Sequence, residues 1–98
     1  LSEATLTVEK MAQNFDMTPE YLRKLYRTQY GVSPKEYMLI KRIEMAKLII
    51  ESGDIRLSCV PYECGFTDYP YFSRVFKKRV GVSPLQYLKQ TKTERGES

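Results

Sequence analysis

An internal repeat constrains the fold of this chain more than any other feature of its sequence. The segment Gly31–Tyr37 (GVSPKEY) recurs fifty positions later as Gly81–Tyr87 (GVSPLQY), and the similarity extends backwards through the preceding helical pattern. Thr18 aligns with Asp68 at the same offset, so a residue type that favours a helix N-cap occurs at the same place in both copies. A repeat of this length predicts one supersecondary unit built twice.

The second copy contains a cationic helical segment. Apolar residues recur at Phe72, Val75, Phe76 and Val80 with the spacing of one helix face. Asp68 is placed to cap the helix, Pro70 is tolerated in its first turn, and Gly81 ends it. The other face carries polar and basic residues: Ser73, Arg74, Lys77 and Lys78. This shape suits entry into a DNA major groove, although an ordinary surface helix with a solvated charged face shows the same pattern.

The first copy predicts two helices separated by a tight turn at Asp16-Met17. Thr7 is expected to cap the first helix, and Thr18 followed by Pro19 opens the second. In the second helix Leu22, Leu25 and Tyr26 are expected to face inward. A short helix, a turn and a helix with a polar outer face are typical of a helix-turn-helix unit. In the second copy, residues 58–66 mirror the first helix and turn, with Gly65 supplying a positive φ and Phe66 filling the gap between helices.

A long helix is predicted between the two copies. Ser33-Pro34-Lys35-Glu36 forms a capping box at its start, and Ser52-Gly53-Asp54 stops it. We therefore predict an all-α fold of about six helices, with two helix-turn-helix subdomains joined by a long central helix. The predicted parts are a first unit (1–32), a linker helix (33–53), a second unit (54–90) whose last helix ends at about Gln90, and a disordered tail (91–98).

Composition limits the function. The 98 residues carry a net charge of +4 with a pI of about 9.1, which favours polyanionic partners. The chain has no histidine, and Cys59 and Cys64 do not form a CxxC motif, so neither an enzyme nor a metal or other cofactor is expected. With no secretory leader or membrane-length apolar run, the sequence predicts a reduced cytoplasmic protein. Its start at Leu1 predicts a fragment of a longer one.

The second half resembles a known family. The chain resembles the DNA-binding domain of AraC/XylS-type transcription regulators. The similar residues run from Tyr62 to Asp68 and from Tyr71 to Lys78, and they include Gly81-Val82-Ser83-Pro84 with Tyr87 and, upstream, residues 42–49. The similarity extends from Leu6 to about Lys89. It implies two helix-turn-helix units whose recognition helices, at about 18–30 and 68–79, read successive major-groove faces of DNA. It also implies a bacterial protein that acts on the nucleoid. It also implies RNA polymerase as a possible partner and a missing sensor or dimerisation domain in the parent protein.

Two departures from the family pattern stand out. Pro61 occupies a position where the family usually has a small alanine, and it removes an amide donor unless it lies in the first turn of its helix. The family's first helix, which precedes Leu6, is expected to be truncated here.

Carried over residue by residue, the resemblance implies base readers in both units. They are Glu20, Arg23 and Lys24 in the first unit, and Tyr69, Pro70, Tyr71, Ser73 and Arg74 in the second. Charge alone assigns phosphate contacts to the basic residues of the two helices, which are Arg23, Lys24, Arg27, Arg74, Lys77 and Lys78.

Some of these assignments remain open at the level of sequence. Tyr71 is as well suited to local packing as to base reading. Glu20 is as well suited to stabilising the positive end of the helix dipole as to base reading. Tyr21, Tyr37, Phe72 and Tyr87 are expected to be core or core-edge aromatics. The alternative function is a helical protein-interaction module that binds acidic partners.

Overall fold

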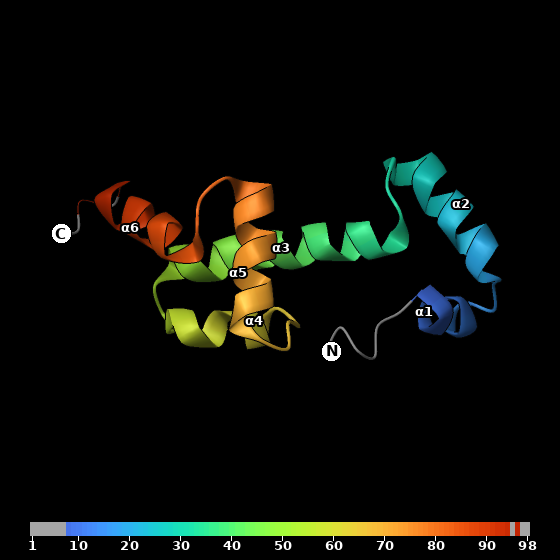
Figure 1. Ribbon diagram of the computed structural model, residues 1–98, viewed down its shortest axis with the longest axis horizontal. Helices are drawn as coiled ribbons and strands as arrows, with labels where there is room; N and C mark the ends of the chain where they lie inside the picture. Colours follow the sequence, from blue (N-terminus) through green and yellow to red (C-terminus); the bar gives the residue numbers. More distant parts are fainter. Residues whose placement is uncertain (1–7, 95, 97–98) are drawn as a thin grey trace. The chain divides into compact units, whose positions relative to one another are not determined.

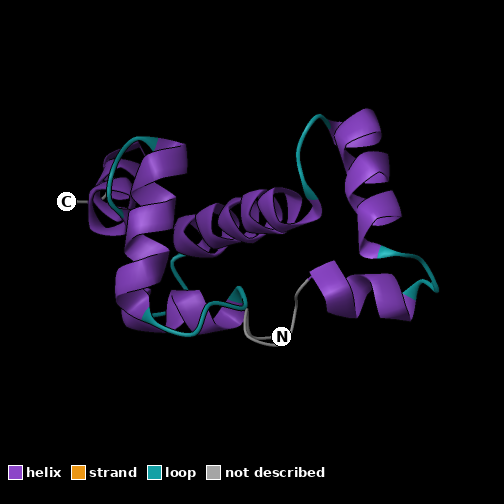
Figure 2. Cartoon of the chain, turned by 45° about the vertical axis from the view of Figure 1, so that its right-hand side comes forward, coloured by secondary structure: helices purple, strands orange, loops and turns teal. Residues whose placement is uncertain are grey.

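The computed structural model describes residues 8–94 and 96, and every regular element in them is a helix (Figures 1 and 2). The elements are, in order, α1 (Val8–Asn14), α2 (Pro19–Tyr30), α3 (Pro34–Ser52), a 3-10 helix η1 (Leu57–Cys59), α4 (Val60–Glu63), α5 (Tyr69–Val80) and α6 (Pro84–Glu94). The predicted all-α fold is confirmed. Among these helices none is long and apolar enough to span a membrane.

The chain divides into two compact units, Leu1–Lys41 and Arg42–Ser98. The boundary falls within α3, so the helix predicted as a separate linker contributes residues to both units. Each unit has buried residues of its own.

The core of the first unit is small. Met11 and Ala12 of α1 and Leu22 of α2 are buried together, and they bring the two helices into contact. Met17, Tyr26 and Met38 pack around them and remain partly exposed. Leu22 is the inward residue that the helical spacing predicted, and its neighbours on the same stripe, Leu25 and Tyr26, are half-buried.

Packed aromatic rings form part of the core of the second unit, beside buried aliphatic side chains. Phe72 and Phe76 on α5 are fully buried, and their ring centroids lie 5.6 Å apart. Phe66 packs edge-on against Phe72 at 5.2 Å, and Tyr87 of α6 packs edge-on against Phe76 at 5.6 Å. Tilted and edge-to-face pairs at these distances are favourable beyond the area they bury. The predictions that Phe66 fills the gap before α5 and that Phe72 is a core residue are confirmed.

The sequence repeat is reproduced in the hydrogen bonds of the helix starts. The amide of Tyr21 donates to Oγ1 of Thr18 at 3.2 Å, and the amide of Tyr71 donates to Oδ1 of Asp68 at 2.8 Å. The hydroxyls of two further caps behave alike: Ser33 accepts from the amide of Glu36 at 3.2 Å, and Ser83 accepts from the amide of Gln86 at 3.1 Å. The predicted caps of α2, α3, α5 and α6 are all present.

The turns before α2 and α5 also match, but with a shorter offset. The amide of Met17 donates to the carbonyl of Ala12 at 2.8 Å, and the amide of Phe66 donates to that of Pro61 at 2.9 Å. Asp16 (φ 57°) and Gly65 (φ 93°) hold the left-handed position in each turn. These pairs are 49 positions apart, whereas the caps are 50 apart, so the second turn contains one extra residue before Asp68.

Pro61 lies in the first turn of α4, where its missing amide leaves no helical bond unmade. Leu57, four residues earlier, cannot accept an α-helical bond from a proline. Its carbonyl instead accepts from the amide of Val60, and this closes the 3-10 helix η1. The shortening that the sequence raised as a possibility is therefore found: α4 is four residues long, and η1 precedes it.

Three expectations need correction or fall outside the described residues. α6 continues to Glu94 instead of ending at about Gln90, because Thr91 is buried and its hydroxyl donates to the carbonyl of Leu88 at 2.8 Å. Tyr21 is 55% exposed and is not a core residue. The predicted cap Thr7 and residues 95, 97 and 98 of the predicted tail lie outside the described residues.

Candidate nucleic-acid interface

The outer face of α5 presents the second set of predicted site residues. Arg74, Lys77 and Lys78 are exposed, and so is Pro70 in the first turn. Ser73 is half-buried between them. All are on one twelve-residue helix whose start is fixed by the Asp68 cap and whose opposite face is anchored by Phe72 and Phe76. The buried aromatic face therefore holds the helix so that its polar face points outward.

The tyrosines at the start of α5 are partly packed. The ring of Tyr69 lies edge-on to Phe72 at 5.7 Å, and burial raises the pKa of the Tyr69 hydroxyl. The ring of Tyr71 lies 5.9 Å from that of Phe66, and the guanidinium of Arg74 lies 5.9 Å from the centroid of the Tyr71 ring. Both tyrosines thus contribute to local packing while part of each remains accessible.

The outer face of α2 presents the first set of predicted site residues. Glu20, Arg23, Lys24 and Arg27 are all exposed, as predicted from the helical spacing. Arg23 lies 3.5 Å from a carboxylate oxygen of Glu9 on α1, with both side chains largely in solvent. An exposed ion pair of this kind is worth less than about 1 kcal/mol. Glu9 therefore does not prevent Arg23 from contacting a phosphate or a base.

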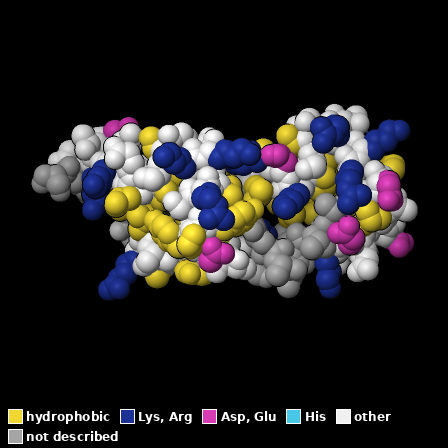
Figure 3. Space-filling view, in the orientation of Figure 1, with side chains coloured by type: hydrophobic (Ala, Val, Ile, Leu, Met, Phe, Trp, Pro, Cys, Tyr) yellow, Lys and Arg dark blue, Asp and Glu magenta, His cyan; other side chains and the backbone are white. Residues whose placement is uncertain are grey.

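Basic side chains are visible over both units in the space-filling view (Figure 3). On the face shown, the basic side chains of each unit lie among acidic, uncharged and apolar side chains. This distribution agrees with a net charge of +4 over 98 residues. It suits contacts with separate phosphates along a duplex, which lower the free energy of binding by releasing condensed counterions.

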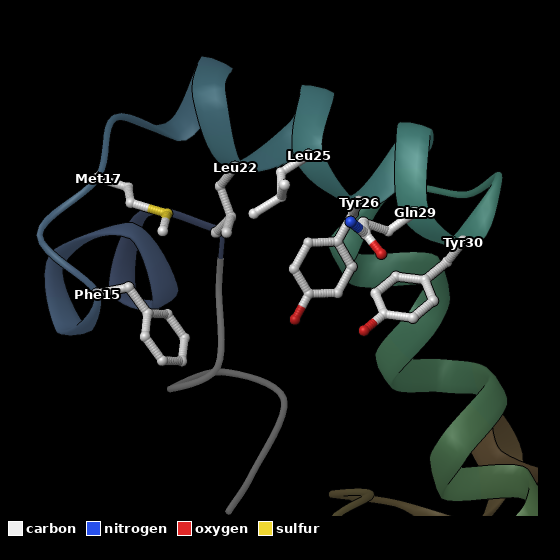
Figure 4. Close-up of a pocket in the computed structure, with 7 residues that line it drawn as sticks. All are labelled: Phe15, Met17, Leu22, Leu25, Tyr26, Gln29 and Tyr30. Carbon is white, nitrogen blue, oxygen red and sulfur yellow. The ribbon is translucent and has the colours of Figure 1, made fainter.

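The inward side of α2 borders a hollow of about 270 Å³ that contains none of the predicted site residues. Figure 4 shows its lining of Phe15, Met17, Leu22, Leu25, Tyr26, Gln29 and Tyr30. The rings of Tyr26 and Tyr30 are 5.2 Å apart, and burial is the main cause that raises the pKa of Tyr26. The hollow is apolar with a polar edge and has no cationic side chain in its lining, so it does not suit a phosphate.

The described residues hold no arrangement suited to a metal ion. No group of three or more His, Cys, Asp or Glu side chains comes together in residues 8–94 and 96. Both cysteines are free; Cys59 is exposed, and burial raises the pKa of the Cys64 thiol to about 11. A thiol with so high a pKa is a poor metal ligand and a poor nucleophile at neutral pH.

Comparison with known proteins places this geometry in a family. Residues 11–90 match the model of a family described as "Helix-turn-helix domain". Over 87 residues the chain is 34% identical to the arabinose operon regulatory protein of Escherichia coli, covering 89% of this chain and 30% of that protein. It also resembles the solved C-terminal domain of AraT, a response regulator from Geobacillus stearothermophilus, with a TM-score of 0.83 and 30% identity over 87% of this chain and 70% of that one.

The chain belongs to the AraC-type helix-turn-helix family.

A second solved structure supports the fold of this AraC-type domain. The DNA-binding domain of AdpA, solved in complex with a target DNA, has a TM-score of 0.88 over 95% of this chain and 84% of that one, at 22% identity. The AraC-type domain spans less than a third of the length of curated relatives that it matches.

One residue on the outer face of this AraC-type domain was missed from the sequence. Tyr21 is exposed beside Glu20 and Lys24, although it was expected to be buried. The repeat contained the signal, because Tyr21 aligns with Tyr71, which was among the predicted site residues. An aromatic side chain at this place can offer apolar contact to a thymine methyl.

Proposed function

We propose that this domain binds double-stranded DNA sequence-specifically and thereby regulates transcription, with α2 and α5 as its two recognition helices. The observation that carries the proposal is the repeated geometry of these helices. Each begins at a side-chain cap of the same kind and exposes basic residues on its outer face. The opposite face is anchored by buried Leu22 in α2 and by buried Phe72 and Phe76 in α5. Two copies of a groove-reading helix suit a target that itself repeats along its axis, as duplex DNA does.

The exposed side chains divide into two roles in this proposal. Arg74 and Arg23 suit base reading, because a guanidinium can donate two hydrogen bonds to O6 and N7 of guanine, and Glu20 can accept from N4 of cytosine. Lys24, at the position equivalent to Arg74, is also assigned to base reading. Arg27, Lys77 and Lys78 suit phosphate contacts, which position the domain without reading sequence. Tyr69, Pro70, Tyr71 and Ser73 line the start of α5 beside these groups.

The proposal extends to the parent protein. The relatives are about three times the length of the matched segment, and their names describe transcription regulators. We infer a parent that also carries a sensing or dimerisation domain and acts on the bacterial nucleoid in the cytoplasm. Contact with RNA polymerase would then couple DNA binding to transcription.

Selection of bound sites from random duplex DNA tests the proposal. The domain should enrich a defined motif, and its affinity for that motif should fall steeply between about 50 and 200 mM salt, since each phosphate contact releases counterions. Enrichment of no motif, together with capture of acidic proteins at the same salt, would favour a protein-interaction module. A duplex of scrambled sequence serves as the control for binding that depends on charge alone.

A further inference from the structure

The exposed guanidinium of Arg74 belongs to a stack of groups that reaches into the core of its unit. It lies 5.9 Å from the centroid of the Tyr71 ring, and the Tyr71 ring lies 5.9 Å from that of Phe66. Phe66 is only 2% exposed and contacts Phe72, which is fully buried. A second guanidinium, that of Arg42 on α3, lies 6.0 Å from the Phe66 ring. The exposed end of Arg74 is thus connected to the core through one ring, that of Tyr71.

This arrangement affects how Arg74 can bind a base. A cation within about 6 Å of a ring centroid is attracted to the ring, and arginine also stacks on aromatic faces. A long side chain that is free in solution loses rotamer freedom on binding, and this loss weakens the complex. A side chain already restrained near its binding conformation loses less. Arg74 is therefore better prepared than an unsupported arginine to form the paired hydrogen bonds that guanine requires.

The first unit provides an internal comparison, because it lacks the stack. Lys24 holds the place of Arg74, and Tyr21 holds the place of Tyr71. Met17 replaces Phe66, as the matching turn hydrogen bonds establish. Without a ring at that position Tyr21 is 55% exposed, and among the described residues no ring contact or cation–π contact involves it. The restraint on the recognition side chain is specific to the second unit.

We propose that Tyr71 is a positioning residue for Arg74: it contacts no base itself, and it sharpens the discrimination that Arg74 makes at one guanine-containing base pair. This inference rests on the proposed function, because it assigns a role within DNA reading. It differs from the sequence-based reading of Tyr71 as a base contact. The two readings lead to different outcomes when Tyr71 and Arg74 are changed together.

The first test uses the free protein. In NMR spectra the side-chain protons of Arg74 should be shifted upfield by the ring current of Tyr71. Tyr71→Leu should abolish the shift, and Tyr71→Phe should retain it, because the stack needs the ring and not the hydroxyl. Tyr62→Leu is the matched control: Tyr62 is an exposed tyrosine of the same unit with no ring contact within the described residues. A wild-type protein without the upfield shift would overturn the proposal.

The second test uses the selected DNA motif and its single-base variants. Tyr71→Leu should lower discrimination about two- to fivefold, the loss expected for an exposed cation–π contact, at the same base pair that Arg74→Ala relaxes. Tyr71→Phe should retain the discrimination of the wild type. In the Arg74→Ala background, Tyr71→Leu should have no further effect on discrimination. An effect at a different base pair, or one that adds to that of Arg74→Ala, would show that Tyr71 reads a base directly and would overturn the proposal.

The two tests separate this proposal from the proposed function. If the wild-type domain selects no motif, the proposed function fails, and the role of Tyr71 in DNA reading fails with it even when the NMR shift is present. If the domain selects a motif but Tyr71→Leu leaves discrimination unchanged, only the positioning role fails. Urea unfolding of each variant shows whether a loss comes from an unfolded domain. If Tyr71→Leu does not fold, Tyr71→Phe still tests the proposal, because a loss of discrimination in that variant would assign the effect to the hydroxyl and overturn the role of the ring.

Discussion

Thr18 and Asp68, which lie fifty positions apart, make the same hydrogen bond at the start of equivalent helices. Each side-chain oxygen accepts from the amide three residues later, at 3.2 Å for Thr18 and 2.8 Å for Asp68. The shorter bond belongs to the carboxylate, whose charge also interacts favourably with the positive end of the helix dipole. The cap of α5 is therefore the stronger of the two.

Removal of the caps should destabilise the protein. Asp68→Ala should lower the free energy of unfolding by about 1 kcal/mol, within the range of about 0.5–2 kcal/mol for lost caps. Asp68→Asn should retain most of that stability, because asparagine also accepts the amide bond. Thr18→Ala should cost less than Asp68→Ala. Urea unfolding monitored by circular dichroism measures all three, and equal stability of Asp68→Ala and wild type would contradict the role of the cap.

Substitution of the glycines that end α2 and α5 should be costly for a backbone reason. Gly31 and Gly81 have φ values of +76° and +100°, and an added Cβ would meet no atom within 4 Å at either site. The penalty for alanine therefore comes from the left-handed conformation and should be about 1–2 kcal/mol. Asparagine should recover part of it. Thermal unfolding of both variants, with Thr28→Ala on the exposed face of α2 as control, tests this; asparagine no better than alanine would contradict it.

Arg74 and Lys77 should differ in their effect on DNA binding. Arg74→Ala should weaken binding to the selected motif by about 1–3 kcal/mol and relax the preference at one base pair. Lys77→Ala should weaken binding to all sequences alike and reduce the salt slope by about one. Titration of the motif, its single-base variants and a scrambled duplex at several salt concentrations separates the two. Uniform losses on every duplex for both variants would show that neither residue reads sequence.

Buried Cys64 should make stability depend on pH in the alkaline range. Desolvation by burial, with a smaller contribution from Glu63, raises the pKa of its thiol from 9.0 to about 11. Between these values the unfolded chain has lost the proton that the folded chain keeps, so the free energy of unfolding should fall as pH rises from about 9 to about 11. Cys64→Ala should make this decline shallower, whereas Cys59→Ser should not, since Cys59 is exposed.

Alkylation supplies an independent measurement of how exposed Cys59 and Cys64 are. In the native protein at mildly alkaline pH, iodoacetamide should modify Cys59 first and reach Cys64 only after denaturant is added. Equal rates for the two thiols in the folded protein would contradict the burial of Cys64.

Local features of the fold were predictable because they depend on neighbouring residues. Thr18-Pro19 and Asp68 mark the starts of α2 and α5, and the structure begins the helices at Pro19 and Tyr69. Gly81 ends α5 as predicted, and Gly31 ends α2 in the same way. The exposure of the charged residues on α2 followed from helical spacing in the same way. Whether these residues contact DNA stays a prediction.

Features that depend on distant contacts were not predictable. Tyr21 was expected to pack like other core-edge aromatics. The repeat aligns it with Tyr71, a predicted site residue, but its exposure also depends on Met17, which stands where Phe66 supports Tyr71 in the second unit. The end of α6 was placed too early because Thr91 looks polar in sequence, although it is buried in the second unit.

The extra residue in the second turn has a practical consequence. Main-chain hydrogen bonds before Thr67 and the Asp68 cap after it match those of the first copy, so the lengthened connection leaves both sides intact. Comparison of the two copies thus shows that the turn tolerates one added residue. The exposed Thr67 is therefore a suitable site for an engineered cysteine. Once the exposed Cys59 is replaced by serine, a fluorophore attached there would sit beside the start of α5 and report when that helix engages a duplex.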